Sequence, residues 1–209
     1  MKFYDFKAAP SPRRVRIFIA EKGMDIDTVQ VDLGGGEQFG EAFRKINPDC
    51  VVPALELDDG TCISEVLAIC SYLEELQPEP NLLGTNAAER AAVLMWNSKI
   101  EQQGFMAIAD AFRNVAERLK DRAVSGPEPY AQIPELAERG RKRANQFFHR
   151  LDGQLANRPY VAGERYSIAD ISALVITDFA TRVKISLPDD AENLQRWYES
   201  VASRPSAAV

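Results

Sequence analysis

The run Val51–Leu55 is interrupted by a proline, and this interruption is the first feature of the chain that suggests a binding site. Proline has no N–H group and cannot complete a strand ladder, so Pro53 is expected at a sheet edge or an unusual, often cis, peptide bond. A strand that ends there leaves the backbone N–H and C=O of Val52 unpaired. These groups could then pair with an extended peptide ligand.

The residues that follow add a place for a negative charge. The turn at residues 58–60 leads into an amphipathic run, Ser64–Leu73, with Glu65 at the start of the expected helix. A helix start offers free N–H groups and a positive dipole end, which favour bound anions. Together with Val52, this arrangement predicts a cradle for a small, charged, extended peptide.

Two patterns of elements, which meet near residue 80, must position this cradle. The first part alternates β-rich and helical runs in the order βαβ and then αββα, which is thioredoxin-like. The segment Gln77–Asn81 contains two prolines, which bar helix continuation, so we expect a linker there. The expected strands are 2–6, 27–31 and two around Pro53 and Gly60, and the expected helices are 12–22, 39–46 and 65–76.

The remainder of the chain is expected to be wholly helical. Apolar side chains recur at intervals of three and four from Phe105 to Leu119, which indicates one stripe of a helix. Residues 124–134, rich in glycine and proline, break the pattern. Ser167 and Asp170 have the spacing of a capping box. Further helices are expected over 134–157, from residue 168, and around 191–203.

The composition excludes several classes of protein. The chain has 209 residues and a net charge of −6, which argues against nucleic acid and anionic membranes as partners. No apolar run approaches the roughly 20 residues of a membrane helix. Residues 1–6 lack the apolar core of a signal peptide. We therefore expect a cytoplasmic protein with neither a nucleic-acid nor a membrane partner.

The cysteines and the histidine offer few chemical options. Cys50, Cys62 and Cys70 form no C-x-x-C pair, and three is an odd number for a disulfide framework. They are either small buried apolar residues or, for Cys50 alone, a redox group. The only histidine is His149, so neither a histidine-based metal site nor a Ser-His triad is expected.

The stretch around Pro53 resembles the glutathione site of soluble glutathione transferases. That family reads V-P-x-L, then D-D-G or D-N-G, then E-S-x-A-I-x-x-Y-L, and this chain matches at all but a few positions. Three further segments resemble the family's first helix, its late helix start and its closing segment. They are Arg14–Gly23, Gly163–Ile171, and Trp197–Tyr198 with Arg204–Ser206.

The resemblance covers nearly the whole chain and implies a fold and an activity. The fold is a thioredoxin-like α/β domain over residues 1–77, a linker over 78–86 and an all-α helical bundle over 87–209. The activity is attack by glutathione on a small hydrophobic electrophile, as in detoxification. Glutathione would act as co-substrate with no other cofactor, and the protein would be a cytoplasmic homodimer.

The resemblance also assigns glutathione contacts to particular residues. Val52 would pair its backbone with the cysteinyl unit, with Pro53 in the cis form. Glu65 would hold the γ-glutamyl amine, and Gln38 lies where the family often contacts the glycyl carboxylate. The alternatives are a first-turn helix acid for Glu65 and a solvated surface side chain for Gln38.

Two departures from the family pattern lower the expected affinity for glutathione. Val66 replaces the usual Ser or Thr, so its backbone N–H alone would meet the γ-glutamyl carboxylate. The lost hydroxyl hydrogen bond costs about 1 kcal/mol. The lysine commonly found two positions before the proline is replaced by Val51.

The residue that would activate the thiol is less evident. A cysteine-like thiol has a pKa of about 8.5, and lowering it by roughly two units takes about 2.7 kcal/mol. Where serine and cysteine classes carry the activating residue, this chain has Ala9. Ser11 either donates to the thiolate or caps the helix that begins at Pro12. A role for Tyr4 is a third reading.

A yeast-type subgroup of the family, which lacks the usual Ser, Cys or Tyr, resembles this chain more closely. The shared residues are Trp96, Asn97, Glu101 and Phe112. That subgroup is thought to activate the thiol through a bound water and the first-helix N-terminus. Where its water-holding histidines would fall, this chain has Arg113 and Asn114. Arg113 is then a candidate for electrostatic support of the sulfur, or a solvated helix residue.

The second substrate and the class of activity stay open. Phe105, Ile108 and Phe112 line either an apolar second-substrate pocket or a core or dimer face. The absence of hydroxyl groups at positions 9 and 66 also fits a binding module without turnover. A thiol-disulfide oxidoreductase or peroxidase using Cys50 is a further alternative.

Overall fold

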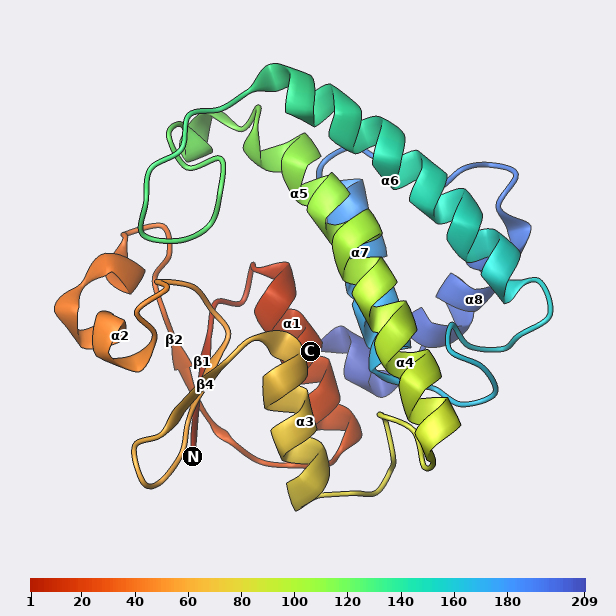
Figure 1. The fold of residues 1–209 in the computed structure, drawn as a ribbon, viewed down its shortest axis with the longest axis horizontal. Coiled ribbons are helices and arrows are strands. Elements are labelled where there is room, and N and C mark those ends of the chain that lie inside the picture. Colours follow the sequence, from red (N-terminus) through yellow and green to blue (C-terminus); the bar gives the residue numbers. More distant parts are fainter. The chain divides into compact units, whose positions relative to one another are not determined.

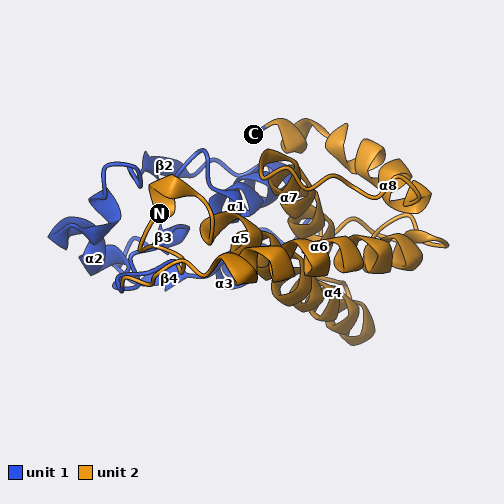
Figure 2. Ribbon diagram, turned by 90° about the horizontal axis from the view of Figure 1, so that it is seen from above, with its two compact units in different colours: residues 1–80, 125–128, 209 blue, residues 81–124, 129–208 orange.

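The computed structural model describes residues 1–209 and divides the chain into two compact units (Figure 2). The first unit consists of Met1–Pro80 with Ser125–Glu128 and Val209. The second consists of Asn81–Val124 and Pro129–Ala208. No helix combines the length and the apolar character needed to cross a membrane.

The first unit is built on a four-stranded mixed sheet in the order β2-β1-β3-β4. Strand β1 (Lys2–Asp5) pairs in parallel with β2 (Asp27–Gln30) and antiparallel with β3 (Ala54–Glu56), which pairs antiparallel with β4 (Cys62–Ser64). Helix α1 (Pro10–Glu21) connects the parallel strands, as such a pair requires. The expected thioredoxin-like order of elements is confirmed.

The helices of this unit bury apolar side chains against the sheet. Helix α1 lies beside α3 (Val66–Leu76) (Figure 1). Phe3, Phe18 and Leu73 are almost fully buried. Each such side chain contributes about 1.5–3 kcal/mol when removed from water. A separate cluster of Val31, Phe43 and Val52 involves α2 (Glu41–Ile46), which follows a 3₁₀ turn at Glu37–Phe39.

A buried ion pair joins the ends of these helices. The Nζ of Lys22 lies 2.5 Å from Oε2 of Glu74 and donates to the carbonyl oxygen of Pro80 at 2.6 Å. Both side chains are over nine-tenths buried. Because a buried charge without its partner is costly, this contact fixes the end of α1 against α3 and the following segment.

The second unit is helical throughout, as the sequence predicts. Helix α7 (Ile168–Arg182) is buried around most of its circumference and contacts several neighbouring helices, which is typical of a central helix (Figure 1). The other elements are α4 (Ala87–Lys99), a π-helical turn (Ile100–Phe105), α5 (Met106–Arg113), α6 (Pro134–Leu155), α8 (Glu192–Ala202) and 3₁₀ turns at Glu117–Leu119 and Pro205–Ala208.

The predicted capping box opens α7. The Oδ2 of Asp170 accepts hydrogen bonds from the N–H and the hydroxyl of Ser167, both at 3.0 Å. Its Oδ1 accepts from the N–H of Val161 and from Nε1 of Trp197. Burial nevertheless raises the pKa of Asp170 to about 6. The box therefore ties the start of α7 to α8 and to the preceding loop.

The expectation of one helical stripe from Phe105 to Leu119 is wrong at its C-terminal end. Phe105 closes the π-helical turn that leads directly into α5, but α5 ends at Arg113, which leaves Val115 about half exposed. The side chain of Asn114 accepts the N–H of Ile133 at 3.0 Å. This contact draws the chain into a loop where the spacing alone predicted another helical turn.

Candidate functional site

The cis peptide between Val52 and Pro53, expected from the sequence, is present at the start of β3. The ladder pairs begin at Ala54, and no hydrogen bond in the structure uses the N–H or C=O of Val52. The Val52 side chain is buried beside Phe43. The side chain thus anchors this segment while the backbone stays available to a ligand.

Glu65 occupies an unusual backbone conformation at the N-cap of α3. Its φ is +70° and its ψ is 129°, outside the left-handed helical well, and its side chain makes no capping hydrogen bond. For a residue with a Cβ such a conformation costs of order 1–3 kcal/mol. The side chain is exposed, and no ion pair or hydrogen bond to it is present. The strain presents an unpaired carboxylate at a helix start.

Val66 is the first residue of α3, directly after Glu65. Because the first backbone N–H groups of a helix have no partner within it, α3 offers free donors beside the Glu65 carboxylate. A ligand that carries both an ammonium and a carboxylate group suits this pair of features. The free amino acid end of a γ-glutamyl peptide has both groups.

Gln38 is buried, so its reading as a solvated surface residue is wrong. Only 9% of it is exposed, because the 3₁₀ turn at Glu37–Phe39 directs it inward. Its Nε2 is 3.5 Å from the carbonyl oxygen of Leu33, while its Oε1 is buried without a hydrogen-bond partner. A buried acceptor without a partner costs about 1–3 kcal/mol, so a ligand group that donates a hydrogen bond to this Oε1 would relieve a deficit.

Ser11 is not the N-cap of α1, contrary to one of its sequence readings. The helix begins at Pro10, and the N-cap is Ala9, which has no side chain to cap with. Pro10 suits the first helical position as well as Pro12 does, so the helix starts earlier. The Oγ of Ser11 accepts a hydrogen bond from Nη2 of Arg14 at 3.1 Å. Its own hydroxyl hydrogen is therefore available to donate.

The hydroxyl of Tyr4 already has an acceptor. It donates to Oε2 of Glu56 at 2.7 Å. Burial and the neighbouring Glu56 raise the pKa of Tyr4 to about 12. A phenol with that pKa and that partner is a poor donor to a thiolate, which disfavours the Tyr4 reading.

Arg113 in the second unit is bound to the loop that follows α5. Its Nη2 donates to the carbonyl oxygen of Arg122 at 2.6 Å, and its Nε donates to that of Ala123 at 3.1 Å. Burial, and then the charge of Arg122, lower the pKa of Arg113. These contacts contradict the solvated-helix reading and give Arg113 a part in holding this loop.

Comparison with known proteins identifies the family. Residues 9–76 match the family model described as glutathione S-transferase, N-terminal domain, and residues 104–205 match glutathione S-transferase, C-terminal domain. Glutathione S-transferase 2 of Saccharomyces cerevisiae is 37% identical over 209 residues, covering 99% of this chain and 87% of that protein. The chain belongs to the glutathione S-transferase family.

Further relatives agree with this assignment. The crystal structure of a glutathione S-transferase domain-containing protein from Marinobacter aquaeolei is similar with a TM-score of 0.92 at 37% identity, covering 99% of each chain. The disulfide-bond oxidoreductase YfcG of Escherichia coli is 31% identical over 208 residues, covering 96% of this chain and 90% of that protein. Both the expected resemblance and the expected fold are confirmed.

The three cysteines of this glutathione S-transferase family member are free thiols. Cys50 and Cys70 are buried, and burial raises the pKa of the Cys70 thiol well above its usual range. Thiols that act in redox chemistry are accessible and easily ionised. The burial of Cys50 therefore favours the packing role over the redox role.

The two aromatic residues proposed for the second-substrate pocket pack against a common ring that the sequence did not indicate. Phe105 and Phe112 both contact Phe179 of α7, with ring centroids 6.1 and 5.7 Å apart. All three are partly exposed, whereas Ile108 is fully buried, which favours its core reading. Phe179 gave no sequence signal, because apolar residues lie all round α7 and no single face stands out in its sequence.

Proposed function

We propose that this member of the glutathione S-transferase family binds glutathione in its first unit and activates the thiol for attack on small hydrophobic electrophiles. The observation that carries the proposal is the strained backbone of Glu65, which holds an unpaired carboxylate beside the free N–H groups of α3. Strain of this kind persists at binding sites, where the surrounding structure maintains it.

Each part of glutathione has a counterpart in this unit. The γ-glutamyl ammonium would pair with Glu65, and its carboxylate would accept from the N–H of Val66. The cysteinyl backbone would pair with Val52, and Nε2 of Gln38 would donate to the glycyl carboxylate. The contacts with Val52 and Val66 use main-chain groups, which agrees with the missing hydroxyl at position 66.

The first turn of α1 would stabilise the thiolate. Pro10 and Pro12 have no N–H, so Ser11 alone supplies a backbone N–H among the first three helical residues. Ser11 also has a hydroxyl hydrogen free to donate, because Arg14 donates to its oxygen. Ala9 contributes no side-chain donor. Activation would therefore depend on this turn, with or without a bound water.

Glu65→Ala tests the binding site. We expect the variant to fold normally and to lose more than tenfold in glutathione affinity, measured by isothermal titration calorimetry, because a hydrogen bond to a charged group is worth about 1.5–3 kcal/mol. Glu75→Ala, at an exposed acid in the same helix, is the matched control. Unchanged affinity in Glu65→Ala would refute this assignment.

Ultraviolet difference spectra of the wild type with glutathione, from pH 5 to 9, test the activation. A bound thiolate that forms well below the free pKa supports the transferase. Saturable binding without that shift would instead support a binding module that does not turn over. Absence of binding would refute both.

Disulfide reduction is a second candidate activity, favoured by the similarity to a disulfide-bond oxidoreductase. The glutathione thiolate itself would attack the disulfide, and a second glutathione would release the mixed disulfide. No protein cysteine is needed for this route. Activity with a small disulfide that survives replacement of all three cysteines by serine would support it, and loss of that activity in a folded variant would instead point to a protein cysteine.

We also propose a cytoplasmic homodimer that acts in detoxification. Leu94 and Met95 of α4 and Met106 of α5 are 37–48% exposed, and such side chains favour burial in a subunit interface. Analytical ultracentrifugation at micromolar concentration tests the dimer, and a monomer there would refute it.

A further inference from the structure

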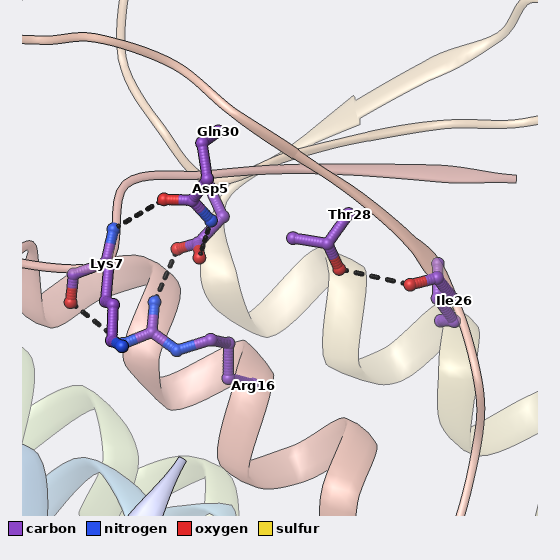
Figure 3. Close-up of polar contacts among 6 residues, drawn as sticks. All are labelled: Asp5, Lys7, Arg16, Ile26, Thr28 and Gln30. Atoms are coloured by element: carbon purple, nitrogen blue, oxygen red, sulfur yellow. Dashed lines mark hydrogen bonds and ion pairs between the residues drawn. The ribbon is translucent and has the colours of Figure 1, made fainter.

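A closed ring of hydrogen bonds holds the peptide groups of Lys7, just before α1 (Figure 3). The N–H of Lys7 donates to Oε1 of Gln30 at 3.0 Å, and its carbonyl oxygen accepts from Nη2 of Arg16 at 3.0 Å. Gln30 and Arg16 come from different elements, β2 and α1. The loop is therefore held from both sides.

Asp5 closes the ring at the end of β1. Its Oδ2 accepts from Nε2 of Gln30 and its Oδ1 accepts from Nη1 of Arg16, both at 2.5 Å. The Asp5 side chain is only 2% exposed, and that of Arg16 is 15% exposed. Charge-assisted hydrogen bonds in so buried a place are strong and directional. The ring thus fixes where the chain leaves β1 and how α1 is oriented.

This ring lies where thiol activation is proposed to occur. Only two residues, Ala8 and Ala9, separate Lys7 from the first turn of α1. A flexible side-chain donor could adjust to the sulfur, but Ala9 offers none. A main-chain donor is effective only where the backbone holds it, because preorganised donors stabilise charge without reorganising.

We infer that Asp5, Arg16 and Gln30 are positioning residues for thiol activation, acting through the Lys7 peptide on the first turn of α1. This inference rests on the proposed function. The three residues need not touch glutathione. Their loss should therefore change ionisation of the bound thiol more than it changes binding.

Gln30→Ala is the most informative variant, because Gln30 is exposed and water can replace it at the Lys7 N–H. We expect the thiol pKa of bound glutathione, from ultraviolet difference titration, to rise by about half a unit to one unit. The pH profile of kcat/KM should move by the same amount, so that activity at pH 6.5 falls about 3- to 10-fold. The dissociation constant of glutathione should change less than twofold.

Thr28→Ala is the matched control. Thr28 is also exposed and lies on the same strand, but its hydroxyl donates only to the carbonyl oxygen of Ile26, outside the ring (Figure 3). Its pH profile should match that of the wild type. Arg16→Lys keeps the charge beside Asp5 but loses the second arm toward Lys7, so an intermediate shift is expected.

The possible results distinguish a failure of the proposed function from a failure of the positioning role alone. A wild type that does not lower the thiol pKa of glutathione overturns the proposed function and this inference together. A wild type that lowers it, with a Gln30→Ala profile that overlays it, overturns the inference alone. Equal shifts in Gln30→Ala and Thr28→Ala would also overturn it, because any change in β2 would then suffice.

Discussion

Replacing Glu65 by glycine should stabilise the fold and weaken glutathione binding at once. Glycine adopts positive φ freely, so the substitution relieves the order 1–3 kcal/mol of strain at this position. The greater entropy of glycine in the unfolded chain costs roughly 0.5–1 kcal/mol. A net gain of about 1 kcal/mol is expected, which corresponds to about 2–4 °C in Tm for a chain of this size.

The same substitution is expected to weaken glutathione binding, the opposite of its effect on stability. Glu65→Gly removes the carboxylate and, with it, a charge-assisted hydrogen bond of about 1.5–3 kcal/mol, or more than tenfold in affinity. Glu65→Ala should lose the same affinity without the gain in Tm, because alanine keeps the Cβ. The pair of variants therefore separates the backbone from the carboxylate.

Differential scanning fluorimetry with and without glutathione measures both effects. The ligand-free Tm should follow the order glycine above wild type, with alanine near the wild type. The upward shift caused by glutathione should be smaller in both variants than in the wild type. A Glu65→Gly protein that is less stable than the wild type would refute the strain argument, even if binding fell as expected.

Three further predictions concern other parts of the chain. Ser11→Ala keeps the backbone N–H of the first turn of α1, so it should retain kcat/KM within about tenfold, whereas a loss beyond about a hundredfold in a folded variant would make the hydroxyl the direct donor. Lys22→Met removes one partner of the buried ion pair and should lower the free energy of unfolding in urea by about 3–5 kcal/mol, with partial recovery when Glu74 is replaced by leucine as well. Asp170 has a folded pKa of about 6, raised from 3.8, so its protonated form is favoured in the folded state and stability is lost as pH rises through this window. The stability of the wild type relative to Asp170→Asn should thus fall by about 3 kcal/mol between pH 3.5 and 6.5, at about 1.36 kcal/mol per unit, and a difference independent of pH would contradict the raised pKa.

Much of the fold follows from local signals in the sequence. Pro53 and the amphipathic run after Ser64 predict the sheet edge and α3, because proline and helical periodicity act over a few residues. The capping box at Ser167 is equally local. The sequence does not fix the start of α1, because the two prolines at positions 10 and 12 both suit a first turn. Nor does it indicate the end of α5, which depends on a contact between Asn114 and Ile133, distant in the sequence.

The candidate site also combines residues that the sequence indicates with residues that only the fold brings together. Val52 and Glu65 stand in a recognisable pattern, although nothing in the sequence indicates the positive φ of Glu65. The ring around Lys7 gave no signal at all. Its side chains come from three elements, β1, α1 and β2. An aspartate, an arginine and a glutamine at such spacing form no recognisable sequence pattern, and only the folded chain brings them together. Phe179 could not be singled out for a related reason, since α7 is buried around most of its circumference and its sequence indicates no single contact face.

The alternation of proline and serine at the start of α1 has a spectroscopic consequence. With no amide hydrogen at positions 10 and 12, a nitrogen-15 correlation spectrum contains one resonance, that of Ser11, for the first three residues of this helix. Its chemical shift should follow the ionisation of bound glutathione with the same midpoint as the ultraviolet signal. A resonance that does not move would place the sulfur elsewhere. The resonance is assignable by its absence from Ser11→Pro, so a single amide can report the charge of the ligand.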